Sequence, residues 1–183
     1  MDGLSRDLVR AQDGDGEAFA RVIGALHGEV VRFCAWFVGS PQDAHDLAQE
    51  AFLRAFRGVR TYRGEAPARQ WIMSIARRTC LDHVARAAAD RRRDESLAPL
   101  SRTADAHDVA GVEMSDVLAA LQPEFREAFV LVRLHGFTYA EAARIMECPR
   151  GTVQSRVARA RLALAAALAD DGGEPALRLG VGA

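Results

Sequence analysis

The sequence predicts an all-α protein made of two small helical domains joined by a flexible linker. Alanine-rich segments carry apolar residues at helical spacing, and strand patterns are weak throughout. The segment 94–112, DESLAPLSRTADAHDVAGV, has no apolar periodicity and contains proline, glycine, serine and acids, which are typical of a linker. The tail 169–183 has the composition of a disordered terminus. We therefore expect one domain over 1–93 and a second over 113–168.

Proline and capping residues indicate where the helices begin. Proline fits the first turn of a helix, where its missing N–H costs nothing, so Pro41, Pro67 and Pro149 mark three helix starts. Thr138 followed by Glu141 has the spacing of a capping box. We expect helices near 4–12, 15–38, 41–58, 67–92, 113–121, 123–135, 138–146 and 149–168.

Charge is distributed in blocks along the chain, although the net charge is only −1. Residues 57–93 hold ten arginines and three acids, and residues 128–168 hold six arginines and two acids. Between them, residues 94–127 hold two arginines and eight acids. All 24 Lys and Arg positions are arginine, whose guanidinium can bind phosphate or guanine through two parallel hydrogen bonds. Two separate basic blocks predict two contacts with a polyanion.

Several functional classes find no support in the sequence. Cys34, Cys80 and Cys148 are far apart and form no Cys/His cluster, so we expect small core residues, with a redox role as the minor alternative. Nucleotide-binding loops, nucleophile elbows and metal-ligand spacings are missing, so we expect no enzyme activity, no cofactor and no metal. Without a signal peptide or a long apolar span, the sequence predicts a cytoplasmic protein that does not insert into membranes.

The stretch CPRGTVQSRVARAR, residues 148–161, predicts a helix with one polar, basic face. At about 100° per residue, one side of this helix is apolar and is expected to be buried; it comprises Val153, Val157, Ala160 and Leu164. The opposite side comprises Thr152, Ser155, Arg156 and Arg159, with Gln154 at its edge. Such side chains read base edges and hold phosphates. With the helix at 138–146 and the break between them, the pattern predicts a helix-turn-helix unit. A merely solvated helix is the alternative.

The expected helix at 41–58 carries one leucine on its polar side. Its inner stripe comprises Ala44, Ala48, Ala51, Phe52 and Ala55. Leu53 lies instead among Asp43, Asp46, Gln49, Glu50 and Arg57. An apolar anchor within a polar rim is typical of a protein-binding site. The alternative is that one exposed leucine needs no explanation.

Basic and aromatic residues alternate in the next segment. Arg60, Thr61, Tyr62, Arg63 and Gly64 form a predicted loop, and the following helix has Ile72, Ile75, Ala76 and Thr79 on its core side. Trp71, Arg78, Asp82 and Arg86 flank that core side. Single-stranded nucleic acid binds to basic grooves with aromatic stacking surfaces, so the loop favours that ligand. Trp71 itself is expected in the core, or at its edge in support of the loop.

Taken together, these segments resemble the extracytoplasmic-function group of bacterial sigma factors, within the sigma-70 family. The resemblance spans about residues 15–93 and 113–167, and three stretches carry it: DAHDLAQEAFLRAF, TYRG…WIMSIARR…LDHVAR and LQPEFREAFVLVRLHGFTYAEAARIMECPRGTVQSRVARAR. It implies a dissociable subunit with a region 2 domain and a region 4 domain, which directs RNA polymerase to promoters. The implied partners are core RNA polymerase, promoter DNA and an anti-sigma factor, which clamps the two domains in this family.

The resemblance also implies roles for individual residues. The residues implied to dock on the coiled coil of the polymerase β′ subunit are Asp46, Gln49, Glu50, Leu53 and Arg57. Those implied to bind the melted −10 element are Arg60, Thr61, Tyr62, Arg63, Trp71, Arg77, Arg78, Asp82 and Arg86. Those implied to read the duplex −35 element are Arg150, Gly151, Thr152, Gln154, Ser155, Arg156, Arg159 and Arg161. Region 4 would also contact the β flap, and the linker would thread toward the polymerase active site.

Three positions depart from the family pattern. Arg78 stands where an asparagine is common, His45 replaces an acid, and Ala68 or Arg69 replaces an aromatic residue before the tryptophan. Because of these departures, the resemblance does not predict which bases the protein prefers in the −10 element. Two other functions remain as alternatives: a helix-turn-helix regulator with an N-terminal sensing domain, and a helical interaction protein whose arginines are only solvated.

Overall fold

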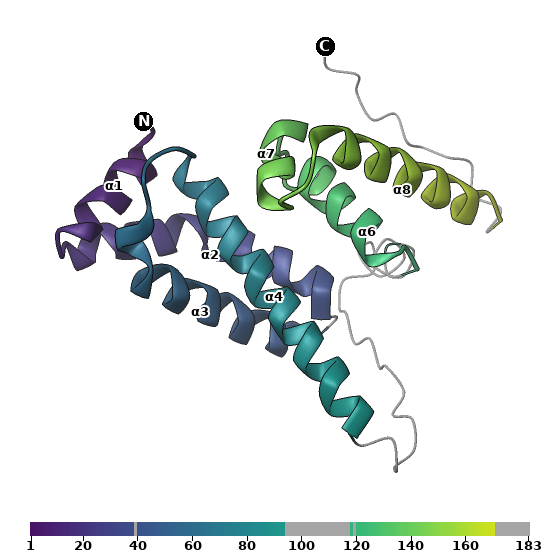
Figure 1. The fold of residues 1–183 in the computed structure, drawn as a ribbon, viewed down its shortest axis with the longest axis horizontal. Helices are drawn as coiled ribbons and strands as arrows, with labels where there is room; N and C mark the ends of the chain where they lie inside the picture. Colours follow the sequence, from purple (N-terminus) through teal and green to yellow (C-terminus); the bar gives the residue numbers. More distant parts are fainter. Residues whose placement is uncertain (39, 94–117, 119, 171–183) are drawn as a thin grey trace.

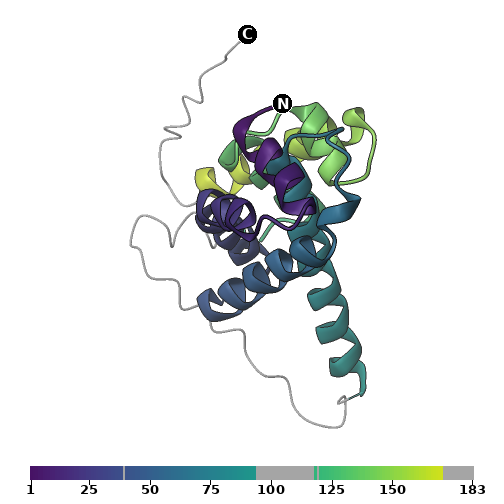
Figure 2. The same ribbon diagram turned by 90° about the vertical axis from the view of Figure 1, so that its left-hand side faces the viewer.

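The computed structural model describes residues 1–38, 40–93, 118 and 120–170, and these residues contain helices and turns but no strand. The elements are α1 (Gly3–Gln12), α2 (Gly16–Val38), α3 (Pro41–Arg57), η1 (Val59–Thr61), α4 (Ala68–Arg93), α6 (Pro123–Phe129), η2 (Val130–Leu134), α7 (Tyr139–Ile145) and α8 (Arg150–Asp170). Helices α1 to α4 form one unit and α6 to α8 a second unit beside it (Figures 1 and 2). The all-α prediction with two helical units is confirmed.

The observed ends of most helices lie within one or two residues of the predicted ones. Helix α8 continues to Asp170, two residues into the segment predicted to be disordered, because the alanine-rich end favours helix. The predicted linker 94–112, most of the predicted helix 113–121, and residues 171–183 lie outside the described residues.

Local capping explains two of the helix starts. Ser40 accepts a hydrogen bond from the backbone N–H of Asp43 at 3.3 Å, and Pro41 occupies the first turn of α3. At α7, the Thr138 hydroxyl accepts from the Glu141 backbone N–H at 3.2 Å, while the Glu141 carboxylate accepts from the Thr138 N–H at 2.8 Å. The predicted capping box is therefore confirmed.

The predicted single helix over 123–135 is wrong in its second half. The chain is α-helical only to Phe129 and then widens into the π-helical segment η2. The backbone N–H of His135 donates to the carbonyl of Val130 at 2.9 Å, five residues back, which is the π-helical pattern. Single-sequence periodicity does not distinguish a π turn from an α turn. The result is that His135 leaves the helix with its side chain only 4% exposed.

One hydrophobic core runs through both helical units. Its largest fully buried side chains come from α1, α2 and α4 on one side and from α6 to α8 on the other. They include Leu8, Phe33, Ile72, Met73, Leu131, Ile145, Val153 and Val157. A smaller cluster comprises Leu118, Leu121, Phe129, Ala160 and Leu164, and Trp36 packs against both clusters. The two units predicted from the sequence therefore share a core in this structure.

Two of the three cysteines are core residues, as predicted. Cys34 on α2 and Cys80 on α4 are buried with their sulfur atoms 3.5 Å apart, and Cys148 is half-buried. The contact with Cys34 and the burial of the thiol both raise the pKa of Cys80 above its ordinary value. A thiol held neutral in this way is a poor nucleophile.

Candidate protein and nucleic-acid interfaces

Helix α3 presents an apolar groove beside α2, at the predicted polymerase-binding face. The predicted inner stripe is confirmed, since Ala44, Ala48, Ala51, Phe52 and Ala55 are all buried. Leu53 is 44% exposed and Phe56 is 53% exposed, and both line a groove of about 550 Å³. The Phe56 ring packs edge-on against Phe19 of α2 at 5.2 Å. Sequence reasoning missed Phe56, although it lies three residues after Leu53 and therefore on the same side of the helix.

Charged side chains connect α3 with α4. Arg54 donates to Glu50 at 2.8 Å and to Asp82 at 2.5 Å. The hydrogen bond from Arg54 lowers the pKa of Glu50 below its ordinary value. The family resemblance implied that Glu50 binds polymerase and that Asp82 binds the −10 element. In the structure, both carboxylates accept hydrogen bonds from Arg54. Asp46 lines the groove and Arg57 is exposed.

The predicted −10 loop, residues 60–64, belongs to the segment between α3 and α4, and hydrogen bonds hold this segment against α1. The Gln12 amide of α1 donates to the carbonyls of Val59 at 2.9 Å and Tyr62 at 2.5 Å. The Tyr62 hydroxyl donates to the carbonyl of Ala66 at 2.8 Å, which closes the loop on itself. Gly64 has a φ of 71°, a conformation that glycine adopts without strain.

The aromatic side chains of this segment are less exposed than side chains that stack on nucleic-acid bases. The Tyr62 ring is only 4% exposed and packs on Trp71 at 5.3 Å. In this structure, the Tyr62 ring therefore supports the loop and is not presented to a ligand, contrary to the stacking role expected from the sequence. Trp71 is half-buried, at the edge of the core. Of the loop residues predicted to bind the −10 element, Arg60, Thr61 and Arg63 are exposed.

The arginines of α4 make ion pairs with the second helical unit. Arg77 pairs with Glu127 of α6, and Arg78 pairs with Glu147 between α7 and α8. The Arg77 side chain is 14% exposed and that of Glu127 is 6% exposed, so this pair is buried. Burial raises the pKa of Glu127 above its ordinary value, with Arg77 opposing the rise. Farther along α4, Arg86 is exposed.

A second junction between the units was not predicted from the sequence. Arg69 of α4 donates to both carboxylate oxygens of Glu29 on α2 and to the backbone carbonyl of His135. Its guanidinium also lies 3.9 Å from the centre of the Phe137 ring. Burial alone would raise the pKa of Glu29, but hydrogen bonds from His135 and Arg69 outweigh it and hold the pKa at about 2. No local pattern indicates contacts between residues this far apart in sequence.

Helix α8 has the two faces expected from its sequence. Val153, Val157, Ala160 and Leu164 are buried, which confirms the predicted stripe. On the other side, Arg150, Gly151, Gln154, Ser155, Arg159 and Arg161 are exposed, while Thr152 and Arg156 are half-buried. Arg159 lies 5.7 Å from the centre of the Phe125 ring, and the Ser155 hydroxyl donates to the carbonyl of Thr152 at 2.9 Å. The polar face predicted to read DNA is thus open to solvent.

The turn before α8 has an unusual backbone. Glu147 has a φ of 54°, a left-handed conformation that is uncommon outside glycine. The Cys148 N–H donates to the carbonyl of Ala143 at 3.1 Å and fixes the reversal between α7 and α8. This turn sets the N-terminus of α8 at an angle to α7, the arrangement of a helix-turn-helix unit.

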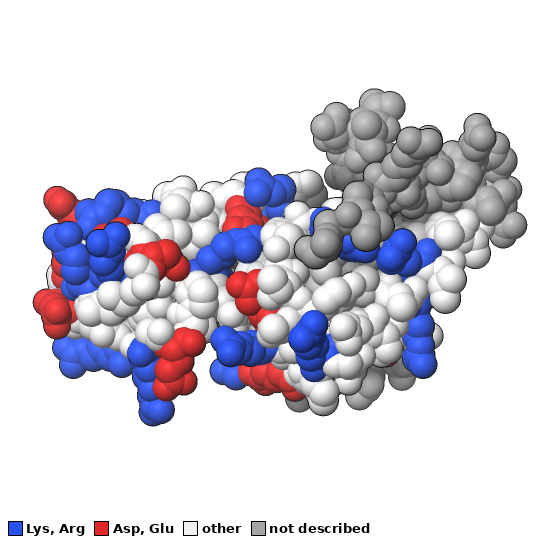
Figure 3. Space-filling model, turned by 90° about the horizontal axis from the view of Figure 1, so that it is seen from above, with Lys and Arg blue, Asp and Glu red and all other residues white. Residues whose placement is uncertain are grey.

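Charge on the described surface is mixed. Figure 3 shows basic and acidic side chains interleaved along the face seen from above, with no single continuous basic patch. Within the described ranges, no group of three or more histidine, cysteine or acidic side chains could hold a metal ion. Among the same residues, no helix is both long and apolar enough to cross a membrane.

Comparisons with known proteins match both helical units separately. The family model of sigma-70 region 2 matches residues 22–90, and that of sigma-70 region 4 matches residues 112–164. The probable RNA polymerase sigma-C factor of Mycobacterium bovis is 39% identical over 165 residues, covering 86% of this chain and 87% of the relative. The ECF RNA polymerase sigma-E factor of Escherichia coli K12 is 30% identical over 175 residues, covering 86% of this chain and 90% of the relative.

Two solved structures share the fold. The structure of CnrH in complex with the cytosolic domain of CnrY has a TM-score of 0.73 and 21% identity, over 93% of this chain and 99% of that one. The sigma factor RpoE of Bartonella quintana, solved in complex with the anti-sigma factor NepR, has a TM-score of 0.73 and 23% identity, over 84% and 98% of the two chains. At these identities, the likeness concerns the fold alone.

Proposed function

We propose that three surfaces of this chain, which belongs to the extracytoplasmic-function group of the sigma-70 family and is an RNA polymerase sigma factor, each bind a different partner. The α3 groove binds core polymerase, the loop at 60–67 with α4 holds the melted −10 strand, and α8 reads the −35 duplex. The observation that carries this proposal is the presence in one chain of an exposed apolar groove and two arginine-bearing faces of different character.

The polymerase contact rests on Leu53 and Phe56. These exposed side chains supply an apolar anchor, and Asp46 lines the same groove. Glu50 lies three residues before Leu53 and therefore on the same side of α3, where it adds a second acid. Such a combination suits a helical partner with apolar and basic residues on its surface, which is the chemistry proposed here for the β′ coiled coil. Region 4 has a further proposed contact with the β flap.

The two DNA contacts differ in mechanism. Helix α8 exposes Gln154 and Ser155 at its N-terminal end, where a recognition helix meets base edges in the major groove. Arg159 and Arg161 lie further along α8 and supply charge for the phosphates. The −10 strand is held by the exposed arginines of the loop and by those of α4, with Trp71 and Tyr62 as the rigid support beneath them. We also propose that residues 94–112 separate the region 2 domain from the region 4 domain.

Further properties follow from this role. The protein performs no chemistry of its own and needs no cofactor, because it acts by binding polymerase and DNA. It works in the cytoplasm, where its partners are found. An anti-sigma factor controls it, a proposal supported by the Bartonella quintana relative of the same fold, which was solved with such a partner.

Binding to core polymerase and to duplex DNA, measured separately, tests this function. The labelled wild-type chain should bind sigma-free core polymerase tightly, and it should bind duplex DNA alone only weakly. Tight sequence-specific binding to duplex DNA with no affinity for polymerase would favour the helix-turn-helix regulator instead. No binding to either, even at low salt where phosphate contacts are strongest, would favour the helical interaction protein.

A further inference from the structure

Helix α1 lies against the loop at 60–67, which the proposed function assigns to the −10 strand. This helix contacts both η1, where the loop starts, and α4, where the loop ends. Its buried side includes Ser5, Leu8 and Ala11. Because α1 precedes residues 22–90, the matching family model of region 2 does not include it. Two polar side chains of α1 nevertheless form hydrogen bonds at the two ends of the loop.

Gln12 holds the start of the loop. Its amide nitrogen donates to the backbone carbonyls of Val59 at 2.9 Å and of Tyr62 at 2.5 Å. Arg60 and Thr61 lie between these two carbonyls in the chain, and both residues are exposed. One donor group therefore fixes the backbone on either side of two residues that are proposed to contact the −10 strand.

Ser5 holds the other end of the loop, where α4 begins. Ala68 is the first residue of α4, so its backbone N–H has no acceptor within the helix. The Ser5 hydroxyl accepts a buried hydrogen bond from this N–H at 3.0 Å, across 63 positions of sequence. Ser5 therefore has the capping role that is usually filled by a residue next to the helix start.

Both side chains project from a helix that is itself fixed in place. Positions 5 and 12 are seven apart, which is about two turns, so they share one side of α1. Asp2 caps α1 by accepting from the Ser5 backbone N–H at 2.7 Å. Asp7 accepts from the Arg21 guanidinium of α2 at 2.7 Å. The two ends of the loop are therefore held at a spacing that α1 determines.

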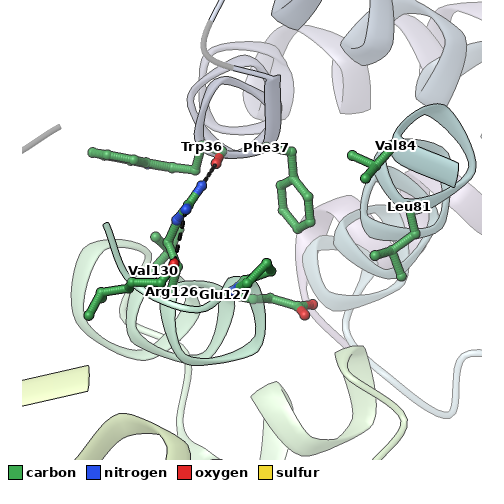
Figure 4. A pocket seen from close by; sticks show the side chains of 9 residues that line it. Trp36, Phe37, Leu81, Val84, Arg126, Glu127 and Val130 are labelled. Carbon is green, nitrogen blue, oxygen red and sulfur yellow. Dashed lines mark hydrogen bonds between the residues drawn. The ribbon is translucent and has the colours of Figure 1, made fainter. Parts of the chain in front are cut away.

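Packing around α4 is looser farther along the helix. Leu81 and Val84 line a pocket of about 330 Å³ together with Phe37 of α2 and Val130. Figure 4 shows these four side chains around the pocket. At the start of α4, by contrast, the hydrogen bond from Ala68 to Ser5 is buried. The loop is therefore joined to the end of α4 that α1 fixes.

The middle of the loop is open to solvent, since Arg63, Gly64 and Glu65 are exposed. The Tyr62 hydroxyl donates to the carbonyl of Ala66 at 2.8 Å and closes this part of the loop. Ordering a flexible segment during binding costs free energy, so a loop that is ordered beforehand binds its ligand more tightly. It also presents its side chains in a defined geometry, which selects between ligands.

We propose that α1 fixes the loop at 60–67 in the conformation that captures the −10 strand, with Gln12 and Ser5 as positioning residues. This inference rests on the proposed function and adds two residues to it, both of which act through the backbone of the loop. When either hydrogen bond is lost, the loop must be ordered during binding. Recognition of a matching −10 strand is then weakened more than binding to an unrelated strand, which depends mainly on phosphate charge.

Hydrogen–deuterium exchange of the full chain tests the contact itself. Gln12→Glu keeps the shape of the side chain but replaces the donor with carboxylate oxygens. The backbone amides of Thr61 and Tyr62 are hydrogen-bonded at the start of the loop. Their exchange should become about tenfold faster in this variant, while the centre of α4 keeps its protection. Ser5→Ala should have the same effect on the amide of Ala68.

Val9→Glu is the matched control for Gln12→Glu, because it adds the same charge at an exposed position of the same helix. Its exchange should equal that of the wild type throughout the loop. Unchanged loop exchange in both Gln12→Glu and Ser5→Ala would overturn the proposal.

Binding of a single strand by the holoenzyme tests the consequence for recognition. The probe is a fluorescent oligonucleotide that carries the −10 element mapped from the protein's own start sites, and a scrambled strand of equal composition is the reference. Gln12→Glu and Ser5→Ala should reduce the preference for the matching strand about tenfold, and Val9→Glu should keep it.

Affinity for core polymerase and for −35 duplex DNA should stay unchanged in the same variants. A general loss of stability would lower these affinities as well, so the ratio of the two strand affinities separates positioning from folding. An undiminished preference, or a parallel loss of every binding activity, would overturn the proposal.

The failure of this inference and that of the proposed function give different results. If wild-type holoenzyme prefers the matching strand and both variants do so equally, the function stands and the positioning role is wrong. If the wild-type protein yields no start sites, or its holoenzyme does not distinguish the two strands, the proposed function fails and the positioning role fails with it.

Discussion

At the scale of single residues, exposed apolar side chains carry the protein contact. Leu53 lies in the α3 groove among polar residues, and a carboxylate there would oppose the burial of an apolar anchor. Leu53→Glu should weaken binding to core polymerase at least tenfold while leaving the fold intact. Titration of labelled protein with core polymerase measures this effect. Val9→Glu is the control, since Val9 is also exposed but lies on α1, and it should bind like the wild type. Equal affinities for both variants would contradict the assigned face.

The ionisation of Glu29 makes the free energy of unfolding depend on pH. The pKa of Glu29 is about 2 in the folded protein, against an ordinary value of 4.5. Because the folded value is the lower one, the carboxylate stabilises the fold fully above about pH 5, and this contribution is lost as the pH falls toward 2. Glu29→Gln should therefore lower the free energy of unfolding at pH 7 by up to about 3 kcal/mol.

Urea unfolding across this pH range measures the contribution. The difference between wild type and Glu29→Gln should shrink steadily between pH 5 and pH 2, which separates Glu29 from other carboxylates that titrate in both proteins. A difference that stays constant with pH would mean that Glu29 acts through packing and not through its charge.

At the scale of elements, the sequence predicts those structural features that depend on residues close together in the chain. The buried stripe of α8, the alanine stripe of α3 and the capping box at Thr138 all follow from spacings of three and four residues, and all are present. The π-helical turn at Val130–Leu134 was missed, because its wider hydrogen bonding depends on packing around His135 and not on local pattern. The burial of Tyr62 was missed for a similar reason, since Gln12, far away in sequence, fastens that loop.

The capping box at α7 supports the helix-turn-helix unit. Thr138→Ala removes the hydroxyl that accepts from the Glu141 N–H, so it should cost about 1 kcal/mol of unfolding free energy. Thr138→Ser keeps the hydroxyl and should cost much less. Thermal or urea unfolding of the two variants checks this difference, and equal losses would show that the methyl group matters more than the cap.

Helix α8 should contribute to DNA binding independently of polymerase binding. Arg159→Ala and Arg156→Ala each remove a cation from the predicted −35 face and should weaken binding to −35 duplex DNA several-fold. The salt dependence of binding should become shallower by about one unit for each phosphate that the variant no longer neutralises. Affinity for core polymerase should remain unchanged, so a parallel loss of both activities would argue for a structural role of these arginines.

At the scale of the whole molecule, the packing of the two units was the least predictable feature. The sequence indicates two helical units with a basic block in each, and the structure joins them through Arg69, Arg77 and Arg78. These arginines are part of the pattern that indicates nucleic acid, yet their partners Glu127 and Glu147 are distant in sequence. A pattern of charges along a chain indicates the type of ligand. It does not show whether the same side chains already form ion pairs with another part of the chain.

The most direct test of the sigma-factor account is transcription in vitro. Purified protein is added to sigma-free core RNA polymerase with a pool of genomic promoter fragments, and transcript starts are mapped. The account predicts discrete new start sites whose upstream sequences align into two elements, one near −35 and one near −10. Starts should disappear when Leu53→Glu replaces the wild type. No new starts, together with sequence-specific binding of the protein alone to duplex DNA, would contradict it.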